Sequence, residues 1–487
     1  MFEIIHPRRR TKIVCTLGPA VASEEKLREM VRNGMDIARL NFSHGAHANF
    51  AEVIEQLRKI EKEEGKPVGI LADIQGPKLR VGQLKNGSLE LVAGQKVIVT
   101  TETIEGSVLA TGEVLIPTAY KDFVKDVEPG HTVLLDDGLL ELKAQARISE
   151  TRLQCEVVSG GLLKNNKGIN VPQASFSAPS ITEKDYDDIL FCTDQGVDFI
   201  AMSFVRTAQE VRHLKQFLKS RGKRTQVIAK IEKPDAISNL ESIIDASDGI
   251  LIARGDLAVE VGNERVPVLQ KKIIRKCNLR GKTVILATQM LMSMVDNPRP
   301  SRAEASDVAN AVVDGADVLM LSNETAIGRH PIESLQMMER IAIEMEQEPR
   351  QLAILWNEWE LPEEGQHQVA LLQSAVRLAS IVKARRMVVL TESGRSALLV
   401  SKCRPSTSVI AITPLLETYR QLSVQWGVEA IYMPDMKELM TQTAVFEAVG
   451  QRLQALRFCQ SGDKIIITAG FPQMGSGSTN TIKIHQI

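Results

Sequence analysis

The sequence predicts an α/β protein built on a (β/α)8 TIM barrel, with an all-β domain inserted after the third strand and an open α/β domain at the C-terminus. Three observations support this prediction. Eight short apolar runs alternate with helix-like segments, each run turns polar at its carboxyl end, and one long β-rich stretch interrupts the alternation. Alternating strands and helices favour a parallel sheet, and eight strands favour a closed barrel.

The expected barrel strands share an apolar start and a polar finish. They are residues 11–18, 36–44, 68–75, 199–206, 226–233, 249–256, 283–289 and 318–325. Between most of them lie helix-like segments. One such segment starts with a capping box, Ser301 followed three residues later by Glu304, and stops at Gly315. Because the carboxyl ends of barrel strands meet at one rim, we expect the polar residues at these ends to converge there.

The interruption and the C-terminal part divide the chain into three predicted domains. Residues 1–76 and 179–348 form the barrel, and residues 77–178 form an inserted β-barrel lid domain that closes over the barrel mouth. The segment 348–368 has the composition of a linker. Residues 366–487 then alternate again as a separate, open α/β domain, predicted to be regulatory.

Composition excludes several classes of protein. The 487 residues are 44% hydrophobic and 24% charged, as in ordinary globular proteins. A formal net charge of −1 provides no overall field for nucleic acid or an anionic membrane. The six cysteines form no CxxC pair, the N-terminus lacks the apolar core of a secretory signal, and no apolar run approaches transmembrane length. We therefore expect a soluble, cytoplasmic protein that binds neither nucleic acid nor membranes.

The stretch VIAKIEKP, residues 227–234, places charge at the end of a buried-type strand. Strand alternation puts Lys230 and Glu232 on one face, about 6–7 Å apart along the strand. Asp256 closes the next strand, and no His or Cys lies near, so the two carboxylates favour an oxygen-liking cation such as Mg²⁺. The spacing leaves room for a substrate oxygen between ammonium and metal, where developing negative charge would be stabilised. A plain buried Lys–Glu ion pair is the alternative, although it leaves Asp256 and Arg39 unexplained.

Further polar groups near the ends of the early strands suit a phosphorylated ligand. A guanidinium can contact phosphate in bidentate fashion, and hydroxyl, amide and imidazole groups add further polar contacts. The residues concerned are Arg39, Asn41, Ser43, His44, Asp73 and Arg80.

The chain resembles the pyruvate kinase family almost end to end. The motifs that carry the resemblance, in that family's order and spacing, are RLNFSHG, ADIQGPKLR, KGINVP, AKIEKPDAI, ARGDLAVE, ATQMLMSM, RAEASDVANAV and LSNETA. The resemblance implies that the chain transfers the phosphoryl group of phosphoenolpyruvate to ADP, giving pyruvate and ATP in the last step of glycolysis. It also implies dependence on Mg²⁺ (or Mn²⁺), allosteric regulation by a phosphorylated effector, and a cytoplasmic homotetramer.

The resemblance also assigns roles at the barrel rim. Lys230 would stabilise the transition state, and Glu232 and Asp256 would hold the divalent ion. Groups that would contact phosphoenolpyruvate are Arg39, Lys230, Gly255, Asp256 and Thr288. Groups that would bind the nucleotide phosphates are Asn41, His44, Arg80 and Lys167. A monovalent-cation site would consist of Asn41, Ser43, Asp73 and the carbonyl of Ile74.

Three positions depart from the family pattern. Lys78 stands where potassium-dependent members carry an acidic residue, while Ala258 and Asn323 replace small residues in motifs whose functional side chains are intact. An ammonium at position 78 can supply the positive charge of a bound potassium ion and would repel that ion. We therefore expect K⁺ not to be required.

An effector site is predicted in TESGRSA, which follows a strand of the C-terminal domain. Hydroxyls, a glycine and an arginine at a strand end suit a phosphate, and the matching loop holds the effector in the family. The residues are Thr391, Ser393, Gly394, Arg395 and Ser396. A second glycine-rich loop, GSGST at 475–479, could take part in anion binding.

Two other functions were considered. A magnesium-dependent, enolate-forming lyase or aldolase could use the same barrel, but it would need neither a nucleotide nor Lys167. A non-catalytic sensor of phosphorylated metabolites would have lost catalytic positions, and none of Arg39, Lys230, Glu232, Asp256 and Thr288 is missing.

Overall fold

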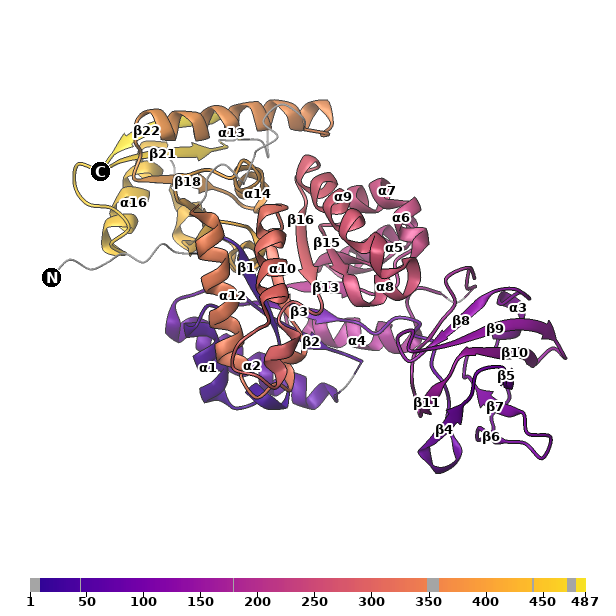
Figure 1. Cartoon of the computed structure of the whole chain (residues 1–487). Helices are drawn as coiled ribbons and strands as arrows, with labels where there is room; N and C mark the ends of the chain where they lie inside the picture. Colours follow the sequence, from indigo (N-terminus) through magenta and orange to yellow (C-terminus); the bar gives the residue numbers. More distant parts are fainter. Residues whose placement is uncertain (1–8, 44, 178, 348–358, 440–441, 471–478) are drawn as a thin grey trace.

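The computed structural model describes residues 9–43, 45–177, 179–347, 359–439, 442–470 and 479–487. A central barrel carries the inserted β-rich domain at one end and the C-terminal domain at the opposite end (Figure 1). The predicted fold class is confirmed. The domain boundaries inferred from the sequence stay predictions.

Eight parallel strands close the barrel in the order β1-β17-β16-β15-β14-β13-β3-β2. The strands are β1 Lys12–Thr16, β2 Ile37–Asn41, β3 Gly69–Asp73, β13 Phe199–Met202, β14 Gln226–Ile231, β15 Gly249–Ala253, β16 Thr283–Ala287 and β17 Val318–Leu321. Each lies within one of the eight apolar runs and ends near the point where that run becomes polar. The polar residues of the runs therefore cluster at the carboxyl rim.

Apolar side chains fill both faces of the barrel wall. Phe199, Ile228 and Leu251 belong to the cluster inside the barrel, and a larger cluster lies between the strands and the outer helices. This double burial explains why the strands are almost continuously apolar in sequence.

Some of the outer helices begin at a residue whose side chain caps the first turn. The helices around the barrel are α1 Glu24–Arg32, α2 His47–Glu64, α4 Glu183–Asp194, α5 Ala208–Ser220, α6 Pro234–Ser238, α7 Leu240–Ala246, α8 Arg254–Val261, α9 Val266–Leu279, α10 Arg302–Val313, α11 Asn323–Ala326 and α12 Pro331–Glu346. The capping box of Ser301 and Glu304 opens α10 as predicted. Gly315 follows the end of α10 with φ +94°, a conformation that favours glycine.

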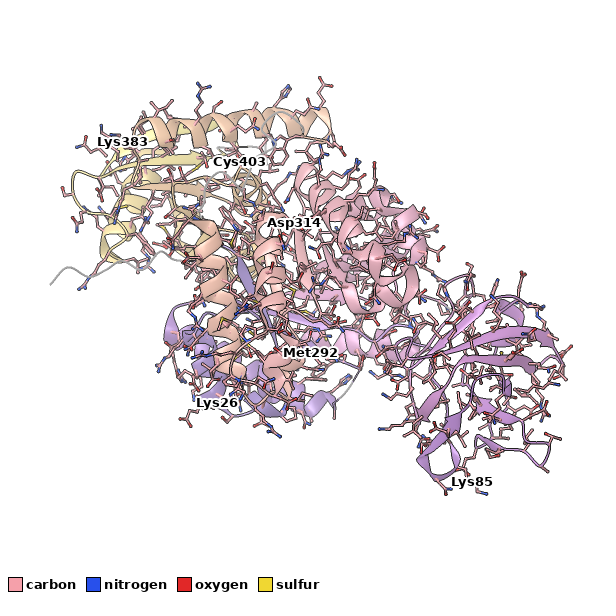
Figure 2. All side chains as sticks on the ribbon, viewed as in Figure 1. Lys26, Lys85, Met292, Asp314, Lys383 and Cys403 are labelled. Carbon is pink, nitrogen blue, oxygen red and sulfur yellow. The ribbon has the colours of Figure 1, made fainter. Side chains whose placement is uncertain are left out.

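The inserted domain is a seven-stranded sheet, in the order β12-β8-β9-β10-β5-β7-β6, with a separate pair β11-β4. Its strands are β4 Ser88–Leu91, β5 Lys96–Thr100, β6 Ser107–Val108, β7 Val114–Pro117, β8 Thr132–Leu135, β9 Leu140–Arg147, β10 Arg152–Ser159, β11 Gly161–Lys164 and β12 Ile169–Asn170. It has its own apolar core, and Lys85 marks its far end (Figure 2). The all-β expectation missed one short helix, α3 Phe123–Asp126, whose Phe123 and Val124 are buried in that core.

The C-terminal domain is an open sheet in the order β20-β19-β18-β21-β22, parallel except for the edge strand β22. Its strands are β18 Arg386–Leu390, β19 Val409–Thr413, β20 Val428–Tyr432, β21 Lys464–Ala469 and β22 Thr481–Gln486. Its helices are α13 Glu363–Ile381, α14 Arg395–Lys402, α15 Leu416–Gln421 and α16 Gln442–Ala455. Apolar clusters on both sides of this sheet show the layered packing expected of an α/β domain.

The C-terminal domain seals the amino-terminal end of the barrel. Val424 belongs to the apolar cluster of the barrel interior, and a Cβ on Gly69 would lie 2.3 Å from the Ser423 hydroxyl. The fully buried Lys402 forms an ion pair with Asp317, and Arg404 lies 2.9 Å from the other carboxylate oxygen. The junction is therefore close-packed and charged.

No helix in the described ranges has the length and apolarity needed to cross a bilayer. All six cysteines are free and buried.

Candidate active site

Asp73, at the end of β3, organises the cations of the rim. One carboxylate oxygen lies 3.1 Å from Lys230 Nζ, and the other accepts hydrogen bonds from the Arg39 guanidinium at 2.8 Å. Burial would raise the pKa of Asp73, but Lys230 and Arg39 lower it below its usual value. Asp73 is therefore ionised and fixes two of the predicted substrate-binding cations.

Lys230 contacts more groups than its strand position suggests. Its ammonium lies 2.8 Å from Glu232 Oε1 and donates to Ser203 Oγ at 2.7 Å. The open space expected between Lys230 and Glu232 is therefore absent, because two charged groups buried side by side pair directly. Burial would lower the pKa of Lys230, yet Asp73, Glu232 and Asp256 raise it, so the side chain stays charged at neutral pH.

Glu232 and Asp256 differ in exposure. Glu232 is 1% exposed, and its second oxygen accepts a hydrogen bond from the Phe204 N–H at 2.9 Å. The side chain of Asp256 is 33% exposed, in the first turn of α8. The pKa of Glu232 is raised by burial, opposed by Lys230 and raised further by the charge of Asp256. The two predicted metal ligands thus lie within electrostatic reach of each other.

This donor set fits a magnesium ion. Across the described ranges, no group of three or more His, Cys, Asp and Glu side chains could hold a metal. An ion held by Glu232 and Asp256 must take its other ligands from water and substrate, as Mg²⁺ does. A divalent cation would also relieve the repulsion between the two carboxylates.

Thr288 closes the rim next to α8 in a strained conformation. It has φ +71°, which is rare for a β-branched residue, and Gln289 follows with φ +53°. Its hydroxyl accepts the Gly255 N–H at 2.8 Å and donates to the Ala287 carbonyl at 2.7 Å. Thr288 and Gly255 are therefore held together at the start of a helix, where backbone N–H groups favour anions.

The predicted monovalent-cation ligands are gathered at one corner of the rim. Asn41 lies opposite Asp73 in the β2–β3 register, and its Oδ1 accepts the Ser43 N–H at 3.2 Å. The Ile74 carbonyl accepts a hydrogen bond from Ser203 at 2.7 Å. The Asp73 carboxylate, the Asn41 amide oxygen and the Ile74 carbonyl thus each already accept from a donor of the protein.

Lys78 lies against the predicted metal ligand Asp256. Its ammonium is 3.6 Å from Asp256 Oδ1, its sole ion pair within the described part of the chain. The sequence predicts Lys78 near the monovalent-cation site, and it did not predict the contact between Lys78 and Asp256.

The predicted nucleotide ligands are split between two domains. An isolated β-bridge between Arg80 and Gly168 brings Arg80 beside Lys167 in the inserted domain. Arg80 donates to the Asn166 carbonyl at 3.0 Å, and Lys167 pairs with Asp136 at 2.7 Å. Asn41 stays on the barrel, and His44 lies outside the described residues.

The predicted effector loop connects β18 to α14. Thr391 Oγ1 accepts the Gly394 N–H at 2.9 Å, and Gly394 has φ +79°. Ser396 is nearly buried, with its hydroxyl 2.7 Å from Thr479 Oγ1, whereas Arg395 is exposed. Of the GSGST loop, only Thr479 is among the described residues.

Three further residues of the rim are not assigned a role from the sequence. Ser203, which directly follows β13, links Lys230 to the Ile74 carbonyl. Thr16 accepts from Arg39 at 2.9 Å, and the buried Glu324 accepts backbone N–H groups from the loops after β16 and β17. In the sequence, each of the three is only a polar residue near the end of a strand. That position does not show which groups its side chain contacts.

Sequence and structure comparisons show which known proteins this chain is similar to. The family model "Pyruvate kinase, barrel domain" matches residues 8–335, and "Pyruvate kinase, alpha/beta domain" matches residues 369–485. A pyruvate kinase of Sporosarcina psychrophila is 43% identical over 483 residues, covering 98% of this chain and 80% of that protein. One from Staphylococcus aureus (strain MRSA252) is 43% identical over 480 residues, with the same coverage. The crystal structure of a pyruvate kinase from Cryptosporidium parvum superposes with a TM-score of 0.89 at 34% identity, covering 100% of this chain and 99% of that one.

Proposed function

The chain belongs to the pyruvate kinase family, and on that premise we propose which of its residues carry out the reaction. Phosphoenolpyruvate and ADP are the substrates of this family, and its members depend on a divalent metal. The lyase or aldolase and the sensor considered from the sequence find no support in the comparisons. The observation that carries the assignment is the contact of Lys230 with Asp73, Ser203 and Glu232 at the barrel rim.

The metal proposed for this chain is Mg²⁺ (or Mn²⁺), held by Glu232 and Asp256. When bound, it supplies concentrated positive charge to substrate oxygens. The electrostatic link between these carboxylates, and the lack of a third acidic or imidazole ligand among the described residues, support a hard ion that keeps water and substrate in its shell.

In the proposed reaction, the bond between phosphorus and the enol oxygen of phosphoenolpyruvate breaks, and a terminal phosphate oxygen of ADP bonds to phosphorus. The enolate left behind takes a proton at carbon and becomes pyruvate. Lys230 neutralises the charge that develops on the enolate oxygen. Arg39, Thr288 and the backbone at Gly255 and Asp256 bind phosphoenolpyruvate. Positioning and electrostatics account for most of the catalysis of phosphoryl transfer.

Lys230 is held ready for this role by its surroundings. Asp73 and Ser203 fix the ammonium, and the nearby carboxylates keep it protonated. A charge that is already oriented costs no reorganisation when the enolate forms, which is the main source of electrostatic catalysis. Ser203 is therefore proposed as a positioning residue for Lys230.

The other proposals come from the family resemblance. Asn41, His44, Arg80 and Lys167 bind the nucleotide phosphates, the last two from the inserted domain. The loop of Thr391, Ser393, Gly394, Arg395 and Ser396 binds a phosphorylated effector. The enzyme works as a cytoplasmic homotetramer and does not require K⁺.

The test is ADP-dependent pyruvate formation by the chain and its Lys230→Met variant. Removing a preorganised charge is expected to lower kcat by about a hundredfold or more while phosphoenolpyruvate still binds. Lys271→Met is the matched control, because Lys271 pairs with Asp314 on the helical surface, away from the rim. Near-normal kcat with a raised KM in Lys230→Met would show that the assigned role is wrong.

A further inference from the structure

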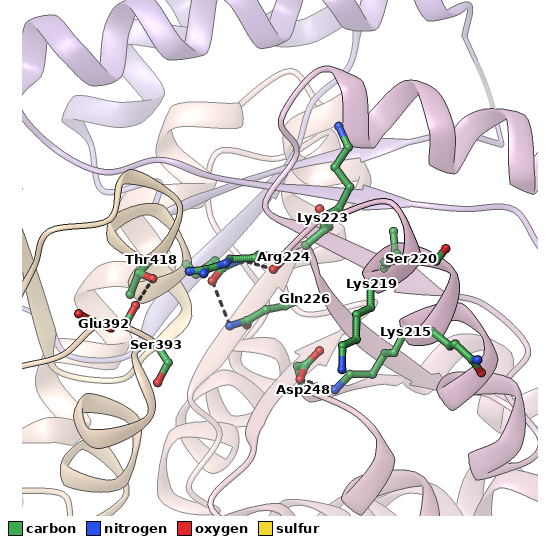
Figure 3. A pocket seen from close by; sticks show the side chains of 14 residues that line it. Lys215, Lys219, Ser220, Lys223, Arg224, Gln226, Asp248, Glu392, Ser393 and Thr418 are labelled. Atoms are coloured by element: carbon green, nitrogen blue, oxygen red, sulfur yellow. Dashed lines mark hydrogen bonds and ion pairs between the residues drawn. The ribbon is translucent and has the colours of Figure 1, made fainter. Parts of the chain in front are cut away.

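A large cleft lies between the barrel and the C-terminal domain, at the end of the barrel opposite the active-site rim. Its volume is about 1140 Å³, and it is lined by the carboxyl-terminal half of α5, the segment leading into β14, the loop that carries Glu392, and helix α15, which carries Thr418 (Figure 3). The volume is ample for a small-molecule ligand. The walls come from two domains, so an occupant would contact both.

The barrel side of this cleft carries an excess of positive charge. Lys215, Lys219, Lys223 and Arg224 line it, against two acidic residues, Asp248 and Glu392. Lys215 is paired with Asp248 at 2.6 Å, and Lys223 with Asp194 at 3.1 Å. For Lys219 and the Arg224 side chain, the described part of the chain provides no hydrogen bond or ion pair.

The spacing of these cations concentrates positive charge, of which the carboxylates beside Lys215 and Lys223 balance only a part. Lys215 and Lys219 are four residues apart on α5, a spacing that places them on one helix face, and their side chains reach into the cleft in Figure 3. Like charges at this spacing destabilise a helix. The helix dipole favours cations at the end of α5, but it does not account for Arg224, which lies beyond the helix.

The remaining lining is rich in hydroxyl and amide groups. Ser220, Thr225, Gln226, Ser393 and Gln421 can each donate and accept hydrogen bonds. Among the described lining residues none is aromatic, so a nucleobase would find no ring to stack on. Such a surface suits a ligand with many hydroxyls better than a nucleotide.

We propose that this cleft binds a phosphorylated sugar, with the phosphate drawn to Lys219 and Arg224 and the sugar hydroxyls against the C-terminal domain. The cleft shares Ser393 with the proposed effector loop, but Thr391, Gly394, Arg395 and Ser396 of that loop are not part of its lining. The proposal goes beyond phosphoryl transfer and does not depend on it.

The position of the cleft gives the ligand a route to the active site. Arg224 lies two residues before β14, the strand that carries Lys230 and is followed by Glu232. The Arg224 carbonyl accepts from Gln421 of the C-terminal domain at 2.8 Å, so the junction between the domains runs through this segment. A ligand that contacts both sides stabilises the folded chain by RT ln(1 + [L]/Kd), and therefore raises Tm as its concentration increases.

Calorimetric titration of the full chain without substrates tests the proposal, with glucose 6-phosphate, inorganic phosphate, glucose and AMP as probes. All variants carry Arg395→Ala, so that binding at the effector loop is weakened. Lys219→Ala with Arg224→Ala is compared with Arg212→Ala, which removes an exposed charge from the same helix outside the cleft. Lys219 and Arg224 are exposed, so folding should persist, as an unchanged Tm without ligand would verify.

We expect glucose 6-phosphate to bind the Arg395→Ala chain more tightly than phosphate, glucose or AMP. Loss of two charged contacts in the double variant should weaken this binding on the order of a hundredfold, and Arg212→Ala should not change it. Absent binding, or equal affinity in the double variant, would overturn the proposal. Equal affinity for inorganic phosphate, or tighter binding of AMP, would overturn the choice of a sugar. Because no turnover is measured, these outcomes are separate from failure of the proposed catalysis.

Discussion

Replacing Lys78 tests the contact between this lysine and the proposed metal ligand Asp256. The ammonium lies 3.6 Å from Asp256 Oδ1, and the two side chains are 29% and 33% exposed. A fixed cation at this place competes with a metal for the same carboxylate. Lys78→Met removes that competition, and Lys78→Glu replaces it with negative charge.

The distance sets the size of the effect. Two unit charges 3.6 Å apart interact by about 1 kcal/mol in bulk water and about 4–5 kcal/mol at an effective dielectric of 20. Since both groups are partly exposed, an intermediate value of about 2 kcal/mol is reasonable. Lys78→Met should therefore lower the Mg²⁺ concentration for half-maximal rate by up to roughly thirtyfold. Lys78→Glu should also make the enzyme dependent on K⁺, because it reverses the charge that stands in for the ion.

The assay is the initial rate of pyruvate formation at fixed ADP, with free Mg²⁺ varied. Tetramethylammonium keeps ionic strength constant, and each series is repeated with added K⁺. The exposed Lys164, on β11 of the inserted domain, provides Lys164→Met as a control for loss of one charge. A many-fold rise with K⁺ in the unmodified chain would refute K⁺ independence. Unchanged Mg²⁺ dependence in Lys78→Met would refute the competition.

Further predictions concern metal, regulation and stability. Glu232→Gln and Asp256→Asn should each raise the Mg²⁺ needed for half-maximal rate and lower the maximum in the same assay, and no change in either would remove them from the site. Arg395→Ala should leave basal activity intact and abolish activation by phosphorylated effectors in rate measurements, whereas a full response would place the regulatory site elsewhere. Asp36→Asn should lower the free energy of unfolding by about 2–3 kcal/mol at pH 7, because burial raises the pKa of Asp36 but Arg9 and neighbouring lysines lower it to about 2. This loss should persist down to about pH 5 and shrink as pH falls through about 4 toward 2, and an equal loss at every pH in denaturant titrations would contradict it.

The sequence predicted the barrel and the gathering of Lys230, Glu232 and Asp256, because strand ends in a parallel barrel must meet at one rim. It could not predict which groups touch. Asp73 and Ser203 are neighbours because β3 pairs with β13 across the whole inserted domain, a pairing set by tertiary structure.

The sequence pattern also could not predict the direction in which the side chains of the rim point. Alternation along a strand predicts which face of β14 carries Lys230. It does not predict that the ammonium pairs with Glu232, because that contact depends on the burial of both groups. Lys78 follows β3 in an irregular segment, where no periodicity defines its orientation, and its partner lies after β15. The proposed sugar-phosphate cleft combines α5 with a loop and helix α15 far along the chain, so no single motif could predict it.

The buried ion pair between Asp317 and Lys402 limits how the two parts of this chain can be exchanged with those of relatives. Asp317 immediately precedes β17, and its carboxylate also accepts a hydrogen bond from the Val284 N–H at 2.8 Å. Its two cationic partners, Lys402 and Arg404, belong to the C-terminal domain. A graft of a foreign C-terminal domain without these two cations would leave a buried carboxylate under the barrel with no counterion, a defect worth about 3–5 kcal/mol. C-terminal domains could therefore be exchanged between such enzymes only when the partner residues on both sides of this contact are exchanged with them.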